Sequence, residues 1–227
     1  MAESTTRTER TGPAQPRLTA VRPGALVAAD PAEVRDGDAD LDDTEIRELS
    51  ADTLVWSGRR RLGSSRVTQL AVTKWSAAGA SIVGSILEDV SVVALAARES
   101  SWWNVEIGQS RIGSAELYDS MWRSVRFSHC KLGYLNLRGA KLTDVVFADC
   151  VIDELDLGRA TANRVAFPGT RIGRLEPTGA TLTDVDLRGA ALAELGDLTG
   201  LRGASITFDQ LLDLAPALAA GIGIRIE

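Results

Sequence analysis

A pattern of apolar residues with a period of five runs through most of this chain. Every fifth residue from Leu62 to Leu192 gives 27 positions, of which 26 are apolar and none is charged; the exception is Pro177. The residue two places before each of these centres is apolar in 20 of the 27 cases and is otherwise mostly Ser or Thr. A period of five fits neither a lone helix nor a lone strand. It predicts a short extended segment and a turn in every five residues.

A second period, of twenty residues, follows from the first. Four five-residue sides return the chain above its start, so the inward positions should repeat coil by coil, and they do. One coil reads Val125, Cys130, Leu135 and Ala140, and the next reads Val145, Cys150, Leu155 and Ala160. Each coil cannot bury its own apolar side chains and must stack on the next. We therefore predict an all-β fold, a right-handed quadrilateral β-helix of about seven coils over residues 62–200.

The segments Leu135–Ala140, Leu155–Leu157 and Val185–Ala190 carry the repeat best. They resemble the pentapeptide-repeat family, whose repeat centres on Leu or Phe with a small residue two places before. The family often has Asp or Asn just before the centre, whereas this chain has them only at Asn136, Asp156 and Asp186. For the quinolone-resistance branch, the resemblance implies a DNA mimic that binds DNA gyrase and dimerises through its C-terminal end.

Two segments precede the repeat. Residues 1–40 are rich in Thr, Arg, Pro, Gly and Asp and show no apolar period, so we expect a disordered tail. Residues 41–61 have apolar spacing that slips out of the main register, which predicts an N-terminal cap or an irregular first coil. A one-residue insertion near Arg59, Arg60 and Arg61 would restore the register. We expect these arginines in a solvated turn rather than in a phosphate site.

Residues 201–227 break the repeat and predict a cap made of a helix and a strand. Thr207 can N-cap a helix that begins near Phe208, and Pro216 should end or kink it. The alternation of Ile222, Ile224 and Ile226 with other residues predicts the strand. One face of the helix is apolar, and it either covers the open lumen or forms a homodimer contact. Its residues are Leu211, Leu212, Leu214 and Leu218.

Charge and cysteine content narrow the class of protein. The net charge is −6, yet residues 1–60 hold 8 basic and 12 acidic groups and the remaining chain holds 17 and 19. The near-neutral body argues against direct binding of nucleic acid. Two cysteines make no disulfide framework. The chain shows no apolar signal region and no run that could span a membrane, so we expect a cytoplasmic protein.

The residues that could carry chemistry do not form a catalytic set. His129 should point outward, beside Asp149 of the next coil and without a nucleophile. Cys130 and Cys150 should stack on the inward face as small apolar residues, without the further ligands that a metal needs. We therefore expect no enzyme activity, no catalytic residue, no metal site and no cofactor.

Charged side chains on the outer faces form columns, in which residues twenty positions apart stack in successive coils. Asp144, Arg164 and Asp184 alternate in sign, as do Glu154, Arg174 and Glu194. One column, from Glu116 to Glu176, has acid or amide throughout and no basic residue in register. With its neighbours it makes a candidate partner-binding acidic stripe: Glu116, Asp153, Glu154, Asp156 and Glu176. The stripe serves either solubility or the imitation of a DNA backbone.

These observations favour a non-catalytic interaction or scaffold module whose partner the sequence does not name. The alternative is a DNA mimic that binds DNA gyrase or another topoisomerase and modulates quinolone sensitivity. That alternative draws on the acidic stripe and on the family resemblance.

Overall fold

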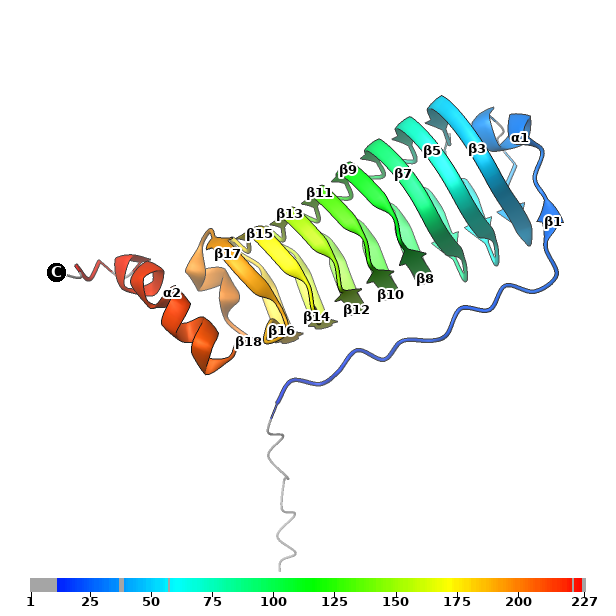
Figure 1. Cartoon of the computed structure of the whole chain (residues 1–227). Helices are drawn as coiled ribbons and strands as arrows, with labels where there is room; N and C mark the ends of the chain where they lie inside the picture. The colour runs from blue at the N-terminus through cyan, green and yellow to red at the C-terminus, as the bar shows by residue number, and fades with distance from the viewer. Residues whose placement is uncertain (1–11, 37–38, 57, 222, 226–227) are drawn as a thin grey trace, which may run out of the picture.

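The chain forms one elongated solenoid with a helix at its C-terminal end (Figure 1). The computed structural model describes residues 12–36, 39–56, 58–221 and 223–225. The early strands are β1 (Val27–Ala28), β2 (Leu41–Asp42), β3 (Thr44–Val55), β4 (Arg61–Gly63), β5 (Arg66–Ser76), β6 (Ser81–Val83), β7 (Ile86–Ala96), β8 (Ser101–Gly108) and β9 (Arg111–Glu116). The later ones are β10 (Met121–Ser128), β11 (Lys131–Asn136), β12 (Lys141–Ala148), β13 (Val151–Asp156), β14 (Thr161–Ala166), β15 (Arg171–Glu176), β16 (Thr181–Asp186), β17 (Ala191–Leu195) and β18 (Ala204–Ser205). The helices are α1 (Pro31–Asp36), the 3-10 helix η1 (Leu198–Leu201) and α2 (Phe208–Gly221).

Successive coils pair in parallel at a register of twenty residues, as the sequence predicts. Trp102 of β8 lies opposite Trp122 of β10, which in turn lies opposite Leu142 of β12. The first coil differs, because Leu41 pairs with Leu62 and Val55 pairs with Ser76 at a register of twenty-one. The register returns to twenty from Arg61 onward, which confirms the predicted one-residue insertion. The solenoid has about nine turns rather than about seven, in part because residues 41–61 form a full first coil that pairs with the next.

The corners of the coils explain how the chain turns every five residues. At three corners of a coil the second residue after the centre adopts a left-handed conformation, as at Ser124, His129 and Gly139, with φ of +55°, +54° and +66°. The equivalent residue of the fourth corner, Tyr134, is not among the left-handed residues. The four sides are therefore not interchangeable, and a shift by one side would place a corner residue in the wrong backbone conformation.

The core is the lumen of the solenoid. Phe127, Phe147 and Phe167 stack one coil above another, with ring centroids 5.1 and 5.2 Å apart. Trp122 lies 5.5 Å from Phe127 and only 1% of it is exposed. Each aromatic ring buries a large apolar area, so this stack holds the central coils together.

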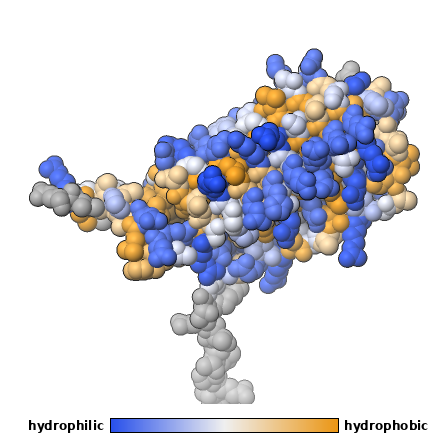
Figure 2. Space-filling view, viewed as in Figure 1, coloured by the Kyte–Doolittle hydropathy of each residue, from blue (hydrophilic) through white to orange (hydrophobic). Residues whose placement is uncertain are grey.

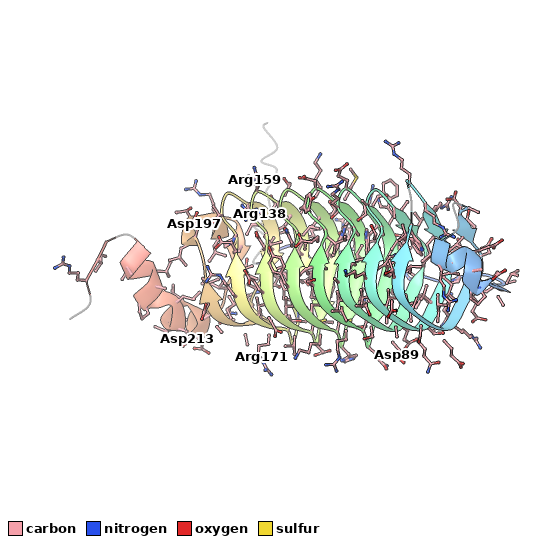
Figure 3. All side chains as sticks on the ribbon, turned by 90° about the horizontal axis from the view of Figure 1, so that it is seen from above. Asp89, Arg138, Arg159, Arg171, Asp197 and Asp213 are labelled. Carbon is pink, nitrogen blue, oxygen red and sulfur yellow. The ribbon has the colours of Figure 1, made fainter. Side chains whose placement is uncertain are left out.

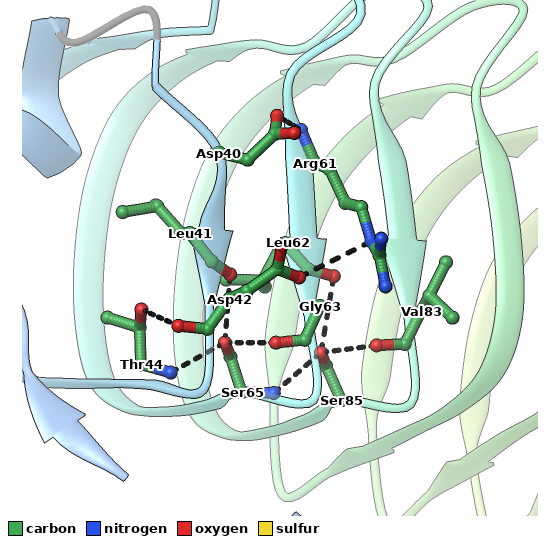
Figure 4. Close-up of polar contacts among 10 residues, drawn as sticks. All are labelled: Asp40, Leu41, Asp42, Thr44, Arg61, Leu62, Gly63, Ser65, Val83 and Ser85. Atoms are coloured by element: carbon green, nitrogen blue, oxygen red, sulfur yellow. Dashed lines mark hydrogen bonds and ion pairs between the residues drawn. The ribbon is translucent and has the colours of Figure 1, made fainter.

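Serine at an inward position replaces a small apolar residue by bonding to the backbone (Figure 4). The Ser65 hydroxyl donates to the carbonyl oxygens of Leu41 and Gly63, and accepts from the Thr44 amide at 3.0 Å. Ser85 accepts in the same way from the Ser65 amide at 3.1 Å. A buried hydroxyl with these partners costs little, which explains why Ser alternates with Ala and Cys in the inward positions.

The N-terminal opening of the lumen is closed by α1 and by a buried arginine. Arg60 is 2% exposed and takes the inward position that Ala80 takes one coil later. Its guanidinium donates to the carbonyl oxygens of Glu33 (2.7 Å), Ala39 (2.8 Å) and Val34 (3.3 Å). The expectation of a solvated turn is therefore wrong for Arg60. Arg60 can be buried because three backbone carbonyls accept hydrogen bonds from its guanidinium. Arg59 and Arg61 are exposed, as expected.

Residues 12–24, which we call the strap, run along the outside of the solenoid from its C-terminal coils toward β1 (Figure 1). At β1 the chain joins the sheet by pairing with β3. The predicted disorder of residues 1–40 is thus wrong for residues 12–36, which bond to the solenoid or form α1. Residues 1–11 and 37–38 lie outside the described residues. The strap lacks an apolar period because backbone hydrogen bonds hold it at several points, and Val21 is its one buried apolar side chain among the described residues.

The C-terminal end carries the predicted helix. Thr207 caps it: the Gln210 amide donates to the Thr207 hydroxyl, and the Gln210 side chain accepts from the Thr207 amide. The helix does not end at Pro216 but continues to Gly221. Pro216 has no amide hydrogen, so the carbonyl one turn earlier loses its helical partner. The helix tolerates this loss because it is exposed and water can reach that carbonyl.

The segment after α2 terminates the helix instead of forming a strand. Gly223 has φ +81°, and the Ile224 amide donates to the Ala219 carbonyl oxygen at 2.8 Å, a common way to end a helix. The predicted strand is therefore wrong at Ile224, because its amide is already used. Ile222 and Ile226 lie outside the described residues.

Candidate interaction faces

The residues of the predicted acidic stripe lie on one side of the solenoid. Glu116, Asn136, Asp156 and Glu176 stack in register through the pairings of β9, β11, β13 and β15. Asn136 donates to a Glu116 carboxylate oxygen at 2.6 Å, so the amide links two coils. Asp156 is only 6% exposed, whereas Asp153 is exposed and Glu116, Glu154 and Glu176 are half-buried. The stripe is a real column, but its central carboxylate is covered.

Arginines from neighbouring positions neutralise part of the stripe. Arg138 lies 2.8 Å from an Asp156 carboxylate oxygen, and Arg174 lies 3.7 Å from Glu176. The hydrogen bond to Asp156 raises the pKa of Arg138. A hydrogen bond from the Thr178 hydroxyl, and more weakly the charge of Arg174, lower the pKa of Glu176. The column has no basic residue in register, as expected, yet arginines outside the register reduce its net charge.

The outer surface is mostly polar on the side that Figure 2 shows, with charged side chains around the whole rod (Figure 3). In Figure 3, Arg138 and Arg159 project on one side and Arg171 and Asp89 on the other. Because Arg138 pairs with Asp156, positive charge is present beside the acidic stripe.

The apolar side chains of α2 are the second predicted site. Phe208, Leu211 and Leu212 are 71%, 41% and 57% exposed, and no residue of α2 is buried. Leu214 and Leu218 are half-buried. The end of the lumen packs instead against η1 and the residues after it, such as Leu201 and Ile206. The structure thus divides the four leucines: Leu211 and Leu212 are exposed, while Leu218 shares a hollow with Leu195 and Leu198 at the end of the rod.

A third site was not among the sequence predictions: the column of side chains to which the strap is bonded. The amide of Ala14 donates to Asp184 at 2.9 Å, that of Arg17 to Asp144 at 2.8 Å, and that of Thr19 to the Ser124 hydroxyl at 2.8 Å. Further along, the Val21 amide donates to Glu106. The acceptors come from four coils, so the strap crosses the sheet.

Asp144 has two partners at this column. Arg164 donates to both of its carboxylate oxygens, at 2.6 and 2.8 Å, and the Arg17 amide donates to one of them. These hydrogen bonds, that of Arg164 first, lower the pKa of Asp144. The carboxylate is therefore charged and fixed in position where it receives the strap.

The residues considered for catalysis or metal binding lie where the sequence predicts them. His129 is exposed at a corner, and Cys130 and Cys150 are buried as free thiols in adjacent coils. Among the described residues, no group of three or more His, Cys, Asp or Glu is arranged to hold a metal ion. None of the described helices has both the length and the apolar character needed to cross a membrane.

A family model of the pentapeptide repeat region matches residues 120–196. Residues 120–196 of the solenoid are therefore similar to pentapeptide repeat regions. The match covers the later coils of the solenoid, from the residue before β10 to the residue after β17. No curated protein matches the chain.

Solved structures similar to the chain include two trypsin-treated variants of QnrB1, described as a plasmid-mediated fluoroquinolone resistance protein. The first is 18% identical over 88% of this chain and 94% of that chain, with a TM-score of 0.29. The second is 11% identical over 88% of this chain and 96% of that chain, with a TM-score of 0.25. Likenesses at these TM-scores carry no argument about the function of this chain.

Two of the unforeseen features had a signal in the sequence. Arg60 takes one of the inward positions of the five-residue register and is the only charged residue among those 27 positions, which marks it as buried. The strap has Pro13, Pro16 and Pro23 and no acidic residue between 12 and 29. That composition favours an extended chain, but nothing in it tells which face the chain will lie on.

Proposed function

We propose that this protein is a non-catalytic interaction module that works in the cytoplasm and binds a protein partner through an outer face. The observation that carries the proposal is the arrangement of polar side chains in straight columns at one-coil spacing, as from Glu116 to Glu176. Coils about 4.8 Å apart present such columns as a flat, regular and rigid surface. Solenoids in general use extended surfaces of this kind for binding.

The acidic stripe of Glu116, Asp153, Glu154, Asp156 and Glu176 is the face that we propose for the partner. Its accessible carboxylates are those of Asp153 and, in part, Glu116 and Glu154. A partner with a basic surface would meet them without displacing Arg138 from Asp156. Charges at such a rim act mainly on the association rate and on the choice of partner.

The alternative is a DNA mimic that binds DNA gyrase and modulates quinolone sensitivity. The regular acidic column supports it. The spacing supports it less, because the column offers at most one carboxylate per about 4.8 Å, whereas one strand of B-DNA carries a phosphate every ~3.4 Å. The pairing of Asp156 and Glu176 with arginines also favours a general interaction module over a DNA mimic.

A supercoiling assay with purified gyrase, with and without a quinolone, separates the two functions. A DNA mimic would inhibit supercoiling or protect gyrase at micromolar protein, and Glu116→Lys with Asp153→Lys would abolish the effect. Glu88→Lys, which lies about half a coil away, serves as the control. We expect no effect of the wild-type chain on gyrase.

A cross-linking experiment in host cytosol tests the interaction module itself. We expect the wild-type chain and Glu88→Lys to capture the same partner, and the Glu116→Lys/Asp153→Lys variant to lose it. Equal capture by all three proteins would overturn the role of the stripe.

The exposed apolar face of α2 supports a further proposal, a homodimer through the C-terminal end. Phe208, Leu211 and Leu212 are accessible together on one helix. An apolar helix face at the end of a rod is suited to a two-fold contact with a second copy, since both copies then bury the same face.

A further inference from the structure

The strap and the column beneath it match each other in hydrogen-bonding capacity. Asp184, Asp144 and Ser124 offer acceptors, and each receives an amide from the strap. Arg164 stands between Asp144 and Asp184 in the column, and a guanidinium accepts nothing. Between Ala14 and Arg17, whose amides bond to these aspartates, stand Gln15, whose side chain donates to Asp186, and Pro16, which has no amide hydrogen to donate. The residue without a donor therefore falls in the same interval as the side chain without an acceptor.

The spacing of the strap matches that of the coils. Ala14 and Thr19 are five residues apart, which is ~15 Å of polyproline II chain at a rise of 3.1 Å per residue. Their acceptors, Asp184 and Ser124, are three coils apart, or ~14 Å at the strand spacing. An extended chain with proline can therefore reach one acceptor after another without strain.

The face beneath the strap is buried as a binding face would be. Ser124 and Asp144 are each 6% exposed, although both lie at outward corners. The outward-facing Val146 and Ala166 of the same side are 8% and 6% exposed. Other outward positions of these coils, such as Arg123 and Lys141, are exposed. Small and apolar side chains next to fixed acceptors suit a close-lying peptide backbone.

Charge adds to this match mainly at one end. The strap carries Arg17 and Arg22 and no acidic residue. The face presents Glu106, Asp144 and Asp186 to it, of which Asp144 and Asp186 are also paired with Arg164 and Arg188 of the face. The Gln15 side chain donates to Asp186 at 3.3 Å. At that end of the strap the face continues as a shallow hollow lined by Asp186, Arg188 and Pro168.

We propose that this face is a binding site for an extended, proline-containing basic peptide segment of a partner protein, and that the strap holds the site in cis. The inference deepens the proposed function by naming a second face and the chemistry of its partner. The face lies ten residues, half a coil, from the acidic stripe, so the two lie on opposite sides of the solenoid. A tethered segment acts at an effective concentration of the order of millimolar, so a partner must displace the strap.

The experiment uses the full-length chain and releases the strap by removing amides. Arg17→Pro with Thr19→Pro deletes two of the four donors but keeps the extended backbone. The matched control, Ala20→Pro with Arg22→Pro, also replaces one arginine and one small residue, but its amides are not among the four. Hydrogen exchange over residues 18–24 should become about tenfold faster or more in the first variant than in the control.

The probe is a fluorescein-labelled synthetic peptide with the sequence of residues 12–24, followed by anisotropy. It should bind the strap-release variant at least tenfold more tightly than the wild type or the control. The same peptide with proline at the positions of residues 17 and 19 should not bind. Adding Ser124→Ala to the strap-release variant should weaken binding several-fold, and adding Ser128→Ala on the same strand should not.

Two results would overturn the inference. One is hydrogen exchange in the strap-release variant as slow as in the wild type, since the amides would then not hold the strap. The other is a released strap with no gain in peptide binding, since the face would then not be a receptor. If the double variant does not fold, Ser124→Ala alone in the wild type must accelerate exchange of the Thr19 amide. Neither result bears on the charge-reversal experiments, which concern the opposite face.

Discussion

At the scale of single residues, Arg60 shows how a charged side chain can replace an alanine inside the lumen. Its guanidinium donates to three backbone carbonyls and lies 5.4 Å from the ring centroid of Trp56. Those carbonyls belong to α1 and the segment after it, which have no strand partners to pair with. Arg60 therefore connects the first full coil to the cap above it.

Replacing Arg60 by Met should destabilise the protein by about 2–4 kcal/mol, because three hydrogen bonds from a charged donor to the backbone of the cap are lost. Arg59→Met, at the exposed neighbouring position, should change stability by less than about 0.5 kcal/mol. Urea denaturation followed by circular dichroism measures both. Equal stability of the two variants would show that Arg60 does not hold the cap.

The pair of Asp144 and Arg164 makes a prediction about pH. The folded protein lowers the pKa of Asp144, so its stabilising contribution is complete above the unfolded pKa of about 3.9 and is lost as the pH falls through the lower, folded value. At pH 7, Asp144→Asn should cost about 1–2 kcal/mol. Below about pH 4 the difference from the wild type should shrink.

The exposed Asp153 provides the control for this pair. Asp153→Asn should cost less than about 0.5 kcal/mol at pH 7. Urea denaturation at a series of pH values checks both variants. A cost of Asp144→Asn that stays constant down to pH 2 would contradict the assignment of the pH dependence to Asp144.

At the scale of elements, the strands and α2 differ in what holds them. Each strand between β3 and β17 pairs with the coils above and below it. By contrast, α2 has no buried residue and is bonded to the solenoid through the Gln210 side chain, which donates to the carbonyls of Leu187 and Ala190 at 2.7 Å. The sequence defined this helix through its capping residue and apolar spacing. It could not tell where the helix lies, since that depends on how far η1 closes the lumen.

The homodimer proposal predicts a change in mass when the apolar face of α2 is made charged. Wild-type protein should elute as a dimer in size exclusion with light scattering, and Leu211→Asp should convert it to a monomer that keeps its β-sheet circular dichroism. Asp213→Ala, on the same helix, should remain a dimer. A monomeric wild type at 100 μM would rule out the dimer.

At the scale of the whole molecule, the solenoid behaves as a stack in which coils contact only their neighbours. Phe147 packs between Phe127 and Phe167, and each strand between β3 and β17 pairs with strands one coil away on both sides. Stability should therefore depend on keeping the register of twenty residues rather than on any single coil.

Deleting one complete coil, residues 141–160, should leave a protein that melts cooperatively with a lower Tm, because Phe167 then stacks on Phe127. Deleting residues 141–150 should abolish the cooperative melt. Deleting half a coil would move Glu154 to a corner whose backbone is left-handed. It would also stack Leu155 on Val125, in the place that Val145 takes in the wild type. Thermal melts by circular dichroism compare the two deletions. Equal Tm values would contradict the distinction between the four sides.

The sequence by itself determined the solenoid, because a side chain at every fifth position can be buried only if the chain turns every five residues. It also determined the inward order of Val, Cys, Leu and Ala and the N-cap at Thr207, since these depend on neighbours at fixed separations. The tertiary structure alone decided the path of the strap, the arginine partners of the acidic stripe and the exposure of α2. Those contacts join residues such as Ala14 and Asp184, which no period relates, so only the folded surface brings their donors and acceptors together.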